Sequence, residues 1–338
     1  MKRALELASK GLGQVAPNPM VGCVIVRNNQ IIAEGYHEQY GSAHAEPTAI
    51  KQVSDEFLKE STLYVTLEPC SHYGKTPPCA DLIISKRIKK VVVGNLDSNP
   101  LVSGKGIQKL KDAGIEVEYG VLDKECRTLN KRFFTFHEKK RPYVILKWAQ
   151  THDGFISRWP LPQEKEDNWI TGKESKELVH QWRAQEQAIL IGYNTLINDN
   201  PLLTTRLASG KNPTRLVLSR TIELPTDLNV FNQDAKTIVF NPLKNEAKNN
   251  IEFVKIDWNK KAQEVLEYCF KKNISSIIVE GGTNTIYHFM NSNAWDEAQV
   301  FVNPTKKFEQ GISAPEINLN NITPINVGND LLYTILNS

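Results

Sequence analysis

No run of about 18 apolar residues occurs in this chain of 338 residues, so the sequence predicts no membrane-spanning helix. Cysteine is scarce as well: five residues are an odd number and too few for a disulfide framework at this length. We therefore expect a reduced, cytoplasmic protein in which any special cysteine is a metal ligand or a nucleophile. The first residues run directly into a helical pattern, with no signal-peptide core behind them.

The chain also has no large excess of positive or negative charge. The net charge is +3, and the 40% hydrophobic and 23% charged residues are close to ordinary globular usage, which excludes disorder and fibrous repeats. Residues 1–142 carry 21 Lys and Arg against 16 Asp and Glu, whereas the remainder carries 20 against 22. A mildly basic first half suits an anionic small molecule at least as well as a nucleic acid. The length favours two domains, at roughly 100–200 residues for each.

Apolar periodicity predicts a layered α/β domain in each half of the chain. The first half is expected to form helices at 2–11, 45–53, 80–86 and 105–113, and strands at 20–26, 31–33, 62–67, 90–94 and 115–119. The second half is expected to form strands at 143–149, 187–192, 214–219, 236–240, 251–256, 275–280 and 297–303, and helices at 173–185, 260–272 and 284–292. The segment 138–142 is charged and ends in a proline, so it is the predicted linker. The predicted domains are therefore 1–141 and 142–338.

The strongest chemical signal comes from His44, Cys70 and Cys79. One imidazole and two thiolates are three good zinc ligands, and they leave the fourth tetrahedral position open for water. Cys70 follows a predicted strand and Cys79 begins a predicted helix, where the partial positive charge of the helix favours a thiolate. A structural zinc would normally have a fourth protein ligand, so the pattern predicts a catalytic zinc that lowers the pKa of water to near 7.

Glu46 stands two residues after His44, too close to be a natural second ligand but within reach of a water on the metal. It is the predicted general acid/base, which carries a proton to a departing amine. His-x-Glu followed by Pro-Cys and a second cysteine is the signature of zinc nucleobase deaminases. The usual motif is Pro-Cys-x-x-Cys, whereas the two cysteines of this chain, Cys70 and Cys79, are farther apart in the sequence. The other three cysteines (Cys23, Cys126 and Cys269) are expected to be small buried hydrophobic residues.

A dinucleotide site is less evident. No Gly-x-Gly-x-x-Gly motif follows a predicted strand, so a Rossmann domain is not supported. The segment Ser275–Asn284 instead predicts a strand, a double-glycine turn and the start of a helix. Backbone N–H groups at such a turn can face a phosphate, although many turns of this kind carry glycines for geometry alone.

The segments Ala16–Val26, Gly35–His37, His44–Glu46 and Tyr64–Ala80 together resemble one family, the bifunctional riboflavin-biosynthesis deaminase/reductases. The long spacing between Cys70 and Cys79 is that family's own version of the motif. The resemblance implies a zinc cytidine-deaminase-like α/β/α domain acting on 2,5-diamino-6-ribosylamino-4(3H)-pyrimidinone 5′-phosphate, with the zinc ligands and the acid/base named above. The positions that match substrate contacts are Asn18, His37, His72 and Lys75. An amide suits a pyrimidine edge, and a lysine suits a phosphate.

The second half resembles the reductase domain of the same family, in segments that include Leu146–Ala149, Trp169–Gly172, Ala188–Gly192 and Val279–Gly282. This resemblance implies a dihydrofolate-reductase-like α/β fold that uses NADPH to reduce the ribosyl chain of 5-amino-6-(5-phosphoribosylamino)uracil to ribityl. The positions matched to NADPH are Ala149, Trp169, Thr195, Asp199, Gly281, Gly282, Thr283 and Asn284. Those matched to the substrate are Asp167, Arg183, Leu203, Arg206 and Glu280.

Within these sets, Arg183 and Arg206 suit a phosphate clamp, because a guanidinium binds phosphate oxygens in pairs. Lys147 and Asp153 flank one strand end, so either could deliver a proton to the reduced sugar. Family members usually have other residues at Thr151–His152, Asp167–Asn168 and Ser219–Arg220. The last difference leaves Arg220 available for the 2′-phosphate of NADPH.

Three alternatives remain open. A nucleic-acid deaminase would line its zinc site with basic and aromatic residues, and only Tyr73 and Lys75 stand near the motif. A non-catalytic binding protein would have lost Glu46 or a zinc ligand. A working deaminase joined to an inactive reductase is the alternative that the sequence excludes least. We expect a phosphorylated pyrimidine as the partner molecule and neither nucleic acid nor membrane, with a homo-oligomer as the default assembly.

Overall fold

A computed structural model describes residues 1–73, 77–99 and 103–337 of the chain. The chain forms two compact units, Met1–Lys140 and Arg141–Ser338. The predicted linker overlaps the end of the last helix of the first unit, which continues to Lys139. Each unit has its own sheet and its own core, and each is described separately below. No helix in the described ranges is both long enough and apolar enough to cross a membrane.

The first unit contains a five-stranded sheet in the order β2-β1-β3-β4-β5. Its helices are α1 (Lys2–Ser9), α2 (Ala45–Ile50), α3 (Asp55–Leu58), α4 (Cys79–Ser85), α5 (Lys105–Asp112), α6 (Asp123–Leu129) and α7 (Lys131–Lys139). Its strands are β1 (Gly22–Arg27), β2 (Gln30–Tyr36), β3 (Thr62–Leu67), β4 (Lys90–Asn95) and β5 (Glu116–Tyr119). Strand β1 is antiparallel to β2 and β3, whereas β3, β4 and β5 are parallel.

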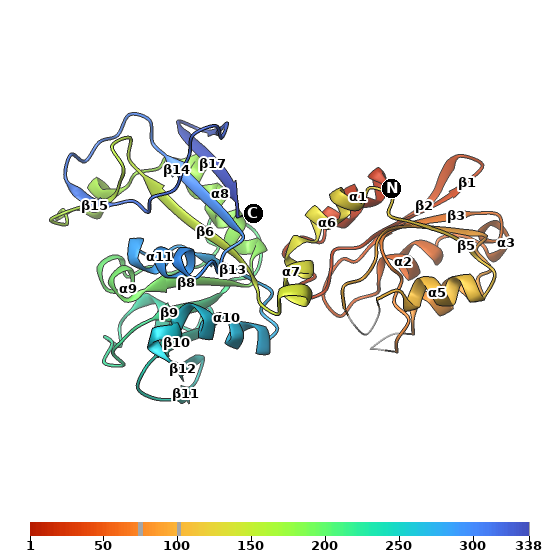
Figure 1. Cartoon of the computed structure of the whole chain (residues 1–338), viewed down its shortest axis with the longest axis horizontal. Coiled ribbons are helices and arrows are strands. Elements are labelled where there is room, and N and C mark those ends of the chain that lie inside the picture. Colours follow the sequence, from red (N-terminus) through yellow and green to blue (C-terminus); the bar gives the residue numbers. More distant parts are fainter. Residues whose placement is uncertain (74–76, 100–102, 338) are drawn as a thin grey trace. The chain divides into compact units, whose positions relative to one another are not determined.

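Helices cover both faces of this sheet (Figure 1). Val24 of β1 packs with Leu7 of α1 on one face, while Cys23 and Ile25 pack with α2, α4 and α5 on the other. Side chains of a strand alternate between faces, so this apolar run is buried on both sides. The predicted strands and helices of this half are all present. Helices α3, α6 and α7 were not predicted: α6 buries one residue, Cys126, and therefore has almost no apolar periodicity to detect.

The second unit contains a ten-stranded sheet in the order β11-β12-β10-β9-β8-β13-β6-β14-β17-β16. The strands are β6 (Tyr143–Gln150), β7 (Phe155–Arg158), β8 (Ala188–Gly192), β9 (Thr214–Leu218), β10 (Thr237–Asn241), β11 (Glu246–Lys248), β12 (Ile251–Lys255), β13 (Ser276–Val279), β14 (Glu297–Val302), β15 (Gly311–Ser313), β16 (Ile325–Val327) and β17 (Asp330–Leu336). From β12 to β14 the neighbours are parallel, and the strands at both edges are antiparallel.

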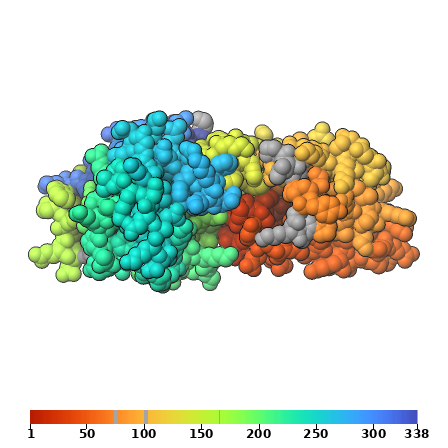
Figure 2. Space-filling model, turned by 90° about the horizontal axis from the view of Figure 1, so that it is seen from below, coloured from red at the N-terminus to blue at the C-terminus, as the bar shows by residue number. Residues whose placement is uncertain are grey.

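The helices of the second unit are α8 (Lys173–Gln185), α9 (Tyr193–Asp199), α10 (Lys261–Lys271) and α11 (Thr283–Asn291), with short 3₁₀ helices η1 (Lys165–Asn168), η2 (Asn229–Phe231) and η3 (Trp258–Lys260). Helices α10 and α11 pack on one face of the sheet, and α8 and α9 pack on the other. Figure 2 shows the surface of this unit over the teal segment that contains β9, β10 and α10. The predicted strands and helices are present, and β7, α9, β11, β15, β16 and β17 were missed. Four of these elements, β7, β11, β15 and β16, are strands of three or four residues, and pairing rather than composition creates such short strands.

Candidate functional site

A histidine and two cysteines from three separate elements meet in the first unit. His44 is the N-cap of α2, Cys70 follows β3, and Cys79 is the first residue of α4. The Nδ1 atom of His44 lies 3.7 Å from the Sγ atom of Cys70 and 3.3 Å from that of Cys79. The ligand atoms of all three residues lie within 4.8 Å of one another. The fold therefore brings the predicted zinc ligands together.

The same geometry fits a tetrahedral zinc ion. Zn–N and Zn–S bonds of ordinary length place a ligating nitrogen and a ligating sulfur about 3.6 Å apart, between the two distances measured here. The backbone N–H of Cys79 donates to Sγ of Cys70 at 3.3 Å. Hydrogen bonds from the Cys79 thiol and the His44 imidazole hold the pKa of the Cys70 thiol well below its usual value. Cys70 is thereby prepared to act as a thiolate ligand.

Glu46 lies in the first turn of α2 and is 3% exposed. Burial, and then the charge of Cys70, raises the pKa of the Glu46 carboxyl to about 7. A carboxyl group with a pKa near neutrality can both accept and return a proton at physiological pH. Glu46 thus has the position and the acidity that the deaminase motif requires of its acid/base.

Asn18 and His37 form a hydrogen-bonded pair beside His44. Nδ1 of His37 faces the carbonyl oxygen of Ala43 at 3.1 Å, and Nδ2 of Asn18 lies 3.2 Å from Nε2 of His37. Burial lowers the pKa of His37, so the neutral imidazole donates through Nδ1 and accepts from the Asn18 amide through Nε2. This arrangement turns the Asn18 carbonyl oxygen away from His37. The ring of His37 meets that of His44 edge-on, with centroids 5.5 Å apart.

Glu68 supports this site, and the sequence pattern did not reveal it. It is 4% exposed and directly precedes Pro69 and Cys70. Its carboxylate oxygens accept backbone N–H groups at 2.8–3.2 Å from Asp97, Gly104, Gly106 and Ile107. A Cβ atom at Gly106 would lie 2.0 Å from the carbonyl oxygen of Pro69, so α5 starts in direct contact with the chain before Cys70. The only sequence signal was a carboxylate placed immediately after an apolar strand and beside a ligand.

The other predicted residues of this half lie as follows. His72 is exposed, and Lys75 lies outside the described residues. The three cysteines without a predicted role, Cys23, Cys126 and Cys269, are each 0% exposed. Cys23 and Cys269 pack within apolar clusters, as the sequence predicted, and Cys126 is also buried.

In the second unit, the predicted cofactor residues gather where neighbouring parallel strands end. Ala149 is near the end of β6, Gly281 follows β13, and Thr195 is in α9, directly after β8; strand β13 pairs with both β6 and β8. The backbone N–H of Gly282 donates to Oγ1 of Thr195 at 3.1 Å. A Cβ atom at Gly281 would lie 2.5 Å from Cα of Ile191, so only glycine allows the turn to lie against β8.

A buried charge cluster lies beside this turn. Nε and Nη2 of Arg183 donate to the two carboxylate oxygens of Glu280 at 3.0 and 2.7 Å. Burial acts to raise the pKa of Glu280, but Arg183 and Lys147 hold it at about 2. His180, 5% exposed, is a further member that the sequence did not single out. Burial and the two cations Arg183 and Arg206 lower its pKa to about 4, so this imidazole is neutral.

The remaining predicted residues of the second unit divide by exposure. Leu203 is 3% exposed and has a φ of 53°. The exposed members are Asp167, Trp169, Asp199, Arg206 and Asn284. The ammonium of Lys176 lies over the Trp169 ring, and Nη1 of Arg206 donates to Oγ1 of Thr204 at 3.2 Å. The hydroxyl of Thr283 donates to the carbonyl oxygen of Ser313 at 2.6 Å.

Asp153 stabilises the turn at residues 308–309. Its carboxylate accepts hydrogen bonds from the Thr151 hydroxyl and from the backbone N–H groups of Phe308 and Glu309. Burial acts to raise the pKa of Asp153, but these hydrogen bonds lower it. The group is therefore an ionised anchor for the 308–309 turn. Of the two predicted proton donors, Lys147 is the one whose charge acts on Glu280.

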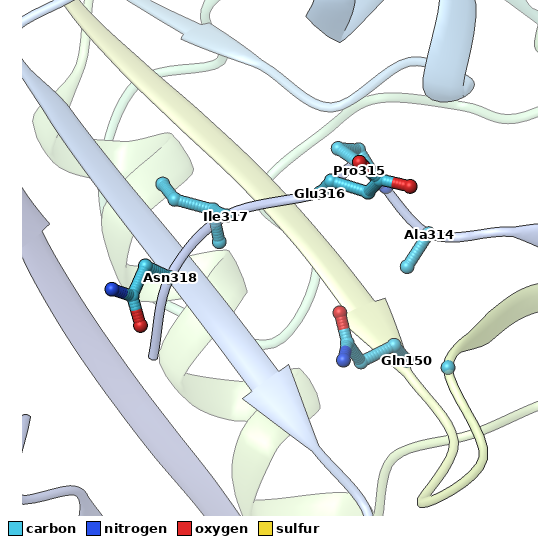
Figure 3. A pocket seen from close by; sticks show the side chains of 7 residues that line it. Gln150, Ala314, Pro315, Glu316, Ile317 and Asn318 are labelled. Carbon is cyan, nitrogen blue, oxygen red and sulfur yellow. The ribbon is translucent and has the colours of Figure 1, made fainter. Parts of the chain in front are cut away.

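A cavity of about 410 Å³ lies beside the end of β6 (Figure 3). Its lining residues are Gln150, Gly154, Ala314, Pro315, Glu316, Ile317 and Asn318. None of the predicted site residues lines it. Gln150 and Ala149 are consecutive in β6, so their side chains point to opposite faces of the sheet.

Comparison with known proteins agrees with the domain type that the sequence predicted for each half of the chain. Residues 1–95 match the cytidine and deoxycytidylate deaminase zinc-binding region, and residues 142–306 match the RibD C-terminal domain. Riboflavin biosynthesis protein RibD of Aquifex aeolicus is 42% identical over 328 residues, which cover 95% of this chain and 90% of the relative.

Two solved structures are similar over the whole chain. A diaminohydroxyphosphoribosylaminopyrimidine deaminase/5-amino-6-(5-phosphoribosylamino)uracil reductase from Thermotoga maritima is 38% identical with a TM-score of 0.88, covering 100% of this chain and 97% of that one. RibD of Acinetobacter baumannii is 33% identical with a TM-score of 0.88, covering 99% and 97%. The predicted fold of a cytidine-deaminase-like domain followed by a reductase domain is confirmed. With a zinc-binding deaminase unit, an NADPH-dependent reductase unit and relatives of this similarity, the chain belongs to the RibD family of bifunctional riboflavin-biosynthesis enzymes.

Proposed function

We propose that the first unit deaminates 2,5-diamino-6-ribosylamino-4(3H)-pyrimidinone 5′-phosphate and that the second reduces the ribosyl chain of 5-amino-6-(5-phosphoribosylamino)uracil to ribityl. The observation that carries this proposal is the convergence of His44, Cys70 and Cys79 with the buried Glu46. Two thiolates are needed at this site, so we also propose a reducing, cytoplasmic setting, in which Cys70 and Cys79 are not oxidised to a disulfide.

In the first unit, His44, Cys70 and Cys79 would hold zinc, which supplies the Lewis acidity that makes water nucleophilic at neutral pH. Glu46 accepts a proton from the attacking water and donates it to the nitrogen that leaves the ring carbon. One C–O bond forms, one C–N bond breaks, and ammonia departs. Asn18 offers its carbonyl oxygen to the pyrimidine edge, since its amide nitrogen is held by His37. His72 and Lys75 are the proposed phosphate contacts.

In the second unit, Ala149, Trp169, Thr195, Asp199 and the turn from Gly281 to Asn284 would bind NADPH, which supplies the hydride. Glu280 and Arg183 hold each other in place and position the sugar that receives the hydride at C1′. Lys147 is the proposed proton donor to the sugar oxygen, because burial lowers its pKa and makes it a better acid. Arg206, with Asp167 and Leu203, completes the proposed substrate site. The guanidinium of Arg183 faces Glu280, so phosphate binding depends mainly on Arg206.

The test is to supply the purified, zinc-loaded chain with the diaminopyrimidinone phosphate and to follow ammonia release and NADPH oxidation together. We expect both signals, with NADPH consumed only after deamination. A sample stripped of zinc by a chelator should lose ammonia release, yet still oxidise NADPH when given the deaminated substrate, because the second unit contains no part of the zinc site.

Each contrary outcome has a distinct meaning. Ammonia release without NADPH oxidation would contradict the reductase assignment. It would favour the alternative in which an active deaminase is joined to an inactive second unit. No ammonia from zinc-loaded protein would contradict the assignment of the diaminopyrimidinone phosphate as the substrate of the first unit. Deamination of an oligonucleotide under the same conditions would then favour a nucleic-acid deaminase.

Arg206→Ala tests the phosphate contact in the reductase. We expect the KM for the deaminated substrate to rise about 10-fold or more, because a charge-assisted hydrogen bond contributes about 1.5–3 kcal/mol. Steady-state kinetics with the deaminated substrate measures this change. The control is Lys211→Ala, which removes an exposed cation from the same segment. Loss of deamination in Arg206→Ala would contradict the model of two independent sites, and an unchanged KM would exclude Arg206 from the substrate site.

A further inference from the structure

The side-chain amide of Asn303 joins three segments of the second unit just after β14. Its Nδ2 atom donates to the carbonyl oxygen of Ile170 at 2.8 Å and to Oδ1 of Asp330 at 3.3 Å. Its Oδ1 atom accepts the backbone N–H groups of Thr305 and Lys306 at 3.1 and 2.9 Å. A flipped amide would set its oxygen against two other acceptors, so these partners give the side chain a single orientation.

The residues between η1 and α8 are held through their backbone by the 303–306 turn. The carbonyl oxygen of Ile170 accepts from Asn303, and the carbonyl oxygen of Trp169 accepts from Nζ of Lys306. Ile170 is 8% exposed, whereas Trp169 is 51% exposed. The backbone of this connection is therefore fixed from below, while the indole ring stays on the surface, where a ligand can contact it.

Asn303 also belongs to the strand end that carries Ala149. In the parallel pairing of β14 with β6, Phe301 lies opposite Ala149. Asn303 follows two residues later, and its backbone N–H donates to the carbonyl oxygen of Gln150 at 3.0 Å. Its backbone is thus attached to β6 and its side chain to the residue after Trp169. Asn303 therefore fixes the spacing between Ala149 and Trp169, two of the residues proposed to bind NADPH.

The 305–306 turn is attached to the same strand end. The backbone N–H of His152, which follows β6, donates to the carbonyl oxygen of Lys306 at 2.9 Å. Lys306 is therefore held at both its N–H and its carbonyl group, the former by Asn303. A lysine side chain is flexible by itself, but from this fixed backbone its ammonium reaches the carbonyl oxygen of Trp169.

We propose that Asn303 is a positioning residue of the reductase, which holds the indole of Trp169 in place to contact NADPH; this inference rests on the reductase function proposed above. Asn303 acts through Trp169 and not by touching the cofactor. Lys306 assists it through the neighbouring carbonyl oxygen. An indole that is already in place loses less conformational freedom when NADPH binds, so this pre-organisation makes binding tighter.

The test combines calorimetric binding of NADPH to the full-length protein with steady-state kinetics on the deaminated substrate. Asn303→Ala should raise the Kd and the KM for NADPH by about 10-fold, and Lys306→Met by about fivefold, because each removes hydrogen bonds that order the indole. The kcat should stay within about twofold of the wild type. A variant that is merely destabilised would instead contain less active enzyme, which lowers the apparent kcat and leaves the KM unchanged.

A double-mutant cycle shows whether Asn303 acts through the indole. Trp169→Ala alone should raise the Kd for NADPH by about 10-fold, the size of a lost aromatic contact together with its ordering. Asn303→Ala added to Trp169→Ala should change the Kd by less than about twofold, because the ring that Asn303 holds is gone.

Three further variants serve as controls. Lys306→Arg keeps an N–H donor of similar reach, so it should bind NADPH within about twofold of the wild type. Lys307→Met and Asn326→Ala remove the same kinds of side chain from exposed positions of the same unit and should leave the Kd unchanged. The thermal midpoint of tryptophan fluorescence reports that each variant is folded, and Lys306→Met carries the test where Asn303→Ala does not fold.

The contrary outcomes are distinct. An unchanged Kd in folded Asn303→Ala, or a loss that multiplies with that of Trp169→Ala, would overturn this inference alone. An unchanged Kd in Lys306→Met would overturn it where Asn303→Ala does not fold. An unchanged Kd in Trp169→Ala would remove Trp169 from the cofactor site and this inference with it. No binding of NADPH by the wild type would overturn the reductase proposal itself.

Discussion

Glu46→Gln should lower the kcat of ammonia release by about 10²–10⁴-fold and leave reduction of the deaminated substrate unchanged. Glutamine fills the same buried space but cannot carry a proton, so the attacking water and the leaving nitrogen lose their proton carrier. The zinc content of the protein should stay the same, because His44, Cys70 and Cys79 are all retained. Ammonia release and metal content are measured on the same preparation, and NADPH oxidation is measured with the deaminated substrate.

Glu38→Gln is the matched control for this change, since Glu38 is exposed and lies on the same unit. It should keep full ammonia release. A Glu46→Gln variant that keeps more than about a tenth of the wild-type rate while holding its zinc would exclude Glu46 as the proton carrier. Loss of zinc in this variant would instead show that Glu46 organises the ligands.

Glu280→Ala should reduce the free energy of unfolding of the second unit by about 3–5 kcal/mol, because Arg183 and Lys147 would remain in the interior without a counter-charge. Arg183 and Glu280 have side chains that are 13% and 9% exposed, so solvent cannot replace the lost partner. All six tryptophans lie beyond residue 141, so tryptophan fluorescence during urea unfolding follows the second unit alone. Glu223→Ala, at an exposed acid, should change the stability by less than about 0.5 kcal/mol.

The same ion pair makes the stability of the second unit depend on pH. The pKa of Glu280 is about 2 in the folded chain, below its ordinary value of 4.5. A carboxyl group with a lowered pKa contributes stability above pH 4.5, and that stability is lost as the pH falls toward 2. The difference corresponds to about 3 kcal/mol. The wild type and Glu280→Ala should therefore converge in stability across this interval. A gap that stays constant down to pH 2 would contradict an ionised Glu280.

Much of the fold was predictable from local patterns. The predicted strand 62–67 and the predicted helix 173–185 have the same bounds as β3 and α8, because their apolar periodicity is strong and their ends are marked by polar or glycine residues. The edge strand β16 and its neighbour β17 were missed, since β17 forms by pairing with β14 and β16 forms by pairing with β17. Burial in β17 alternates along the strand, and such a half-exposed run has a weak signature without its partner.

The candidate site, like the fold, combines features that the sequence predicted with features that only the tertiary structure shows. By itself, the sequence determined the chemistry: an imidazole, two thiolates and a carboxylate at deaminase spacing, and a double-glycine turn after a buried strand. Only the tertiary structure decided that Glu68 anchors the start of α5 and that Arg183 is held by Glu280. Each of these contacts joins residues tens of positions apart in the chain. Local patterns encode which element a residue occupies, whereas the register of the sheet and the packing of helices on it decide which side chains meet.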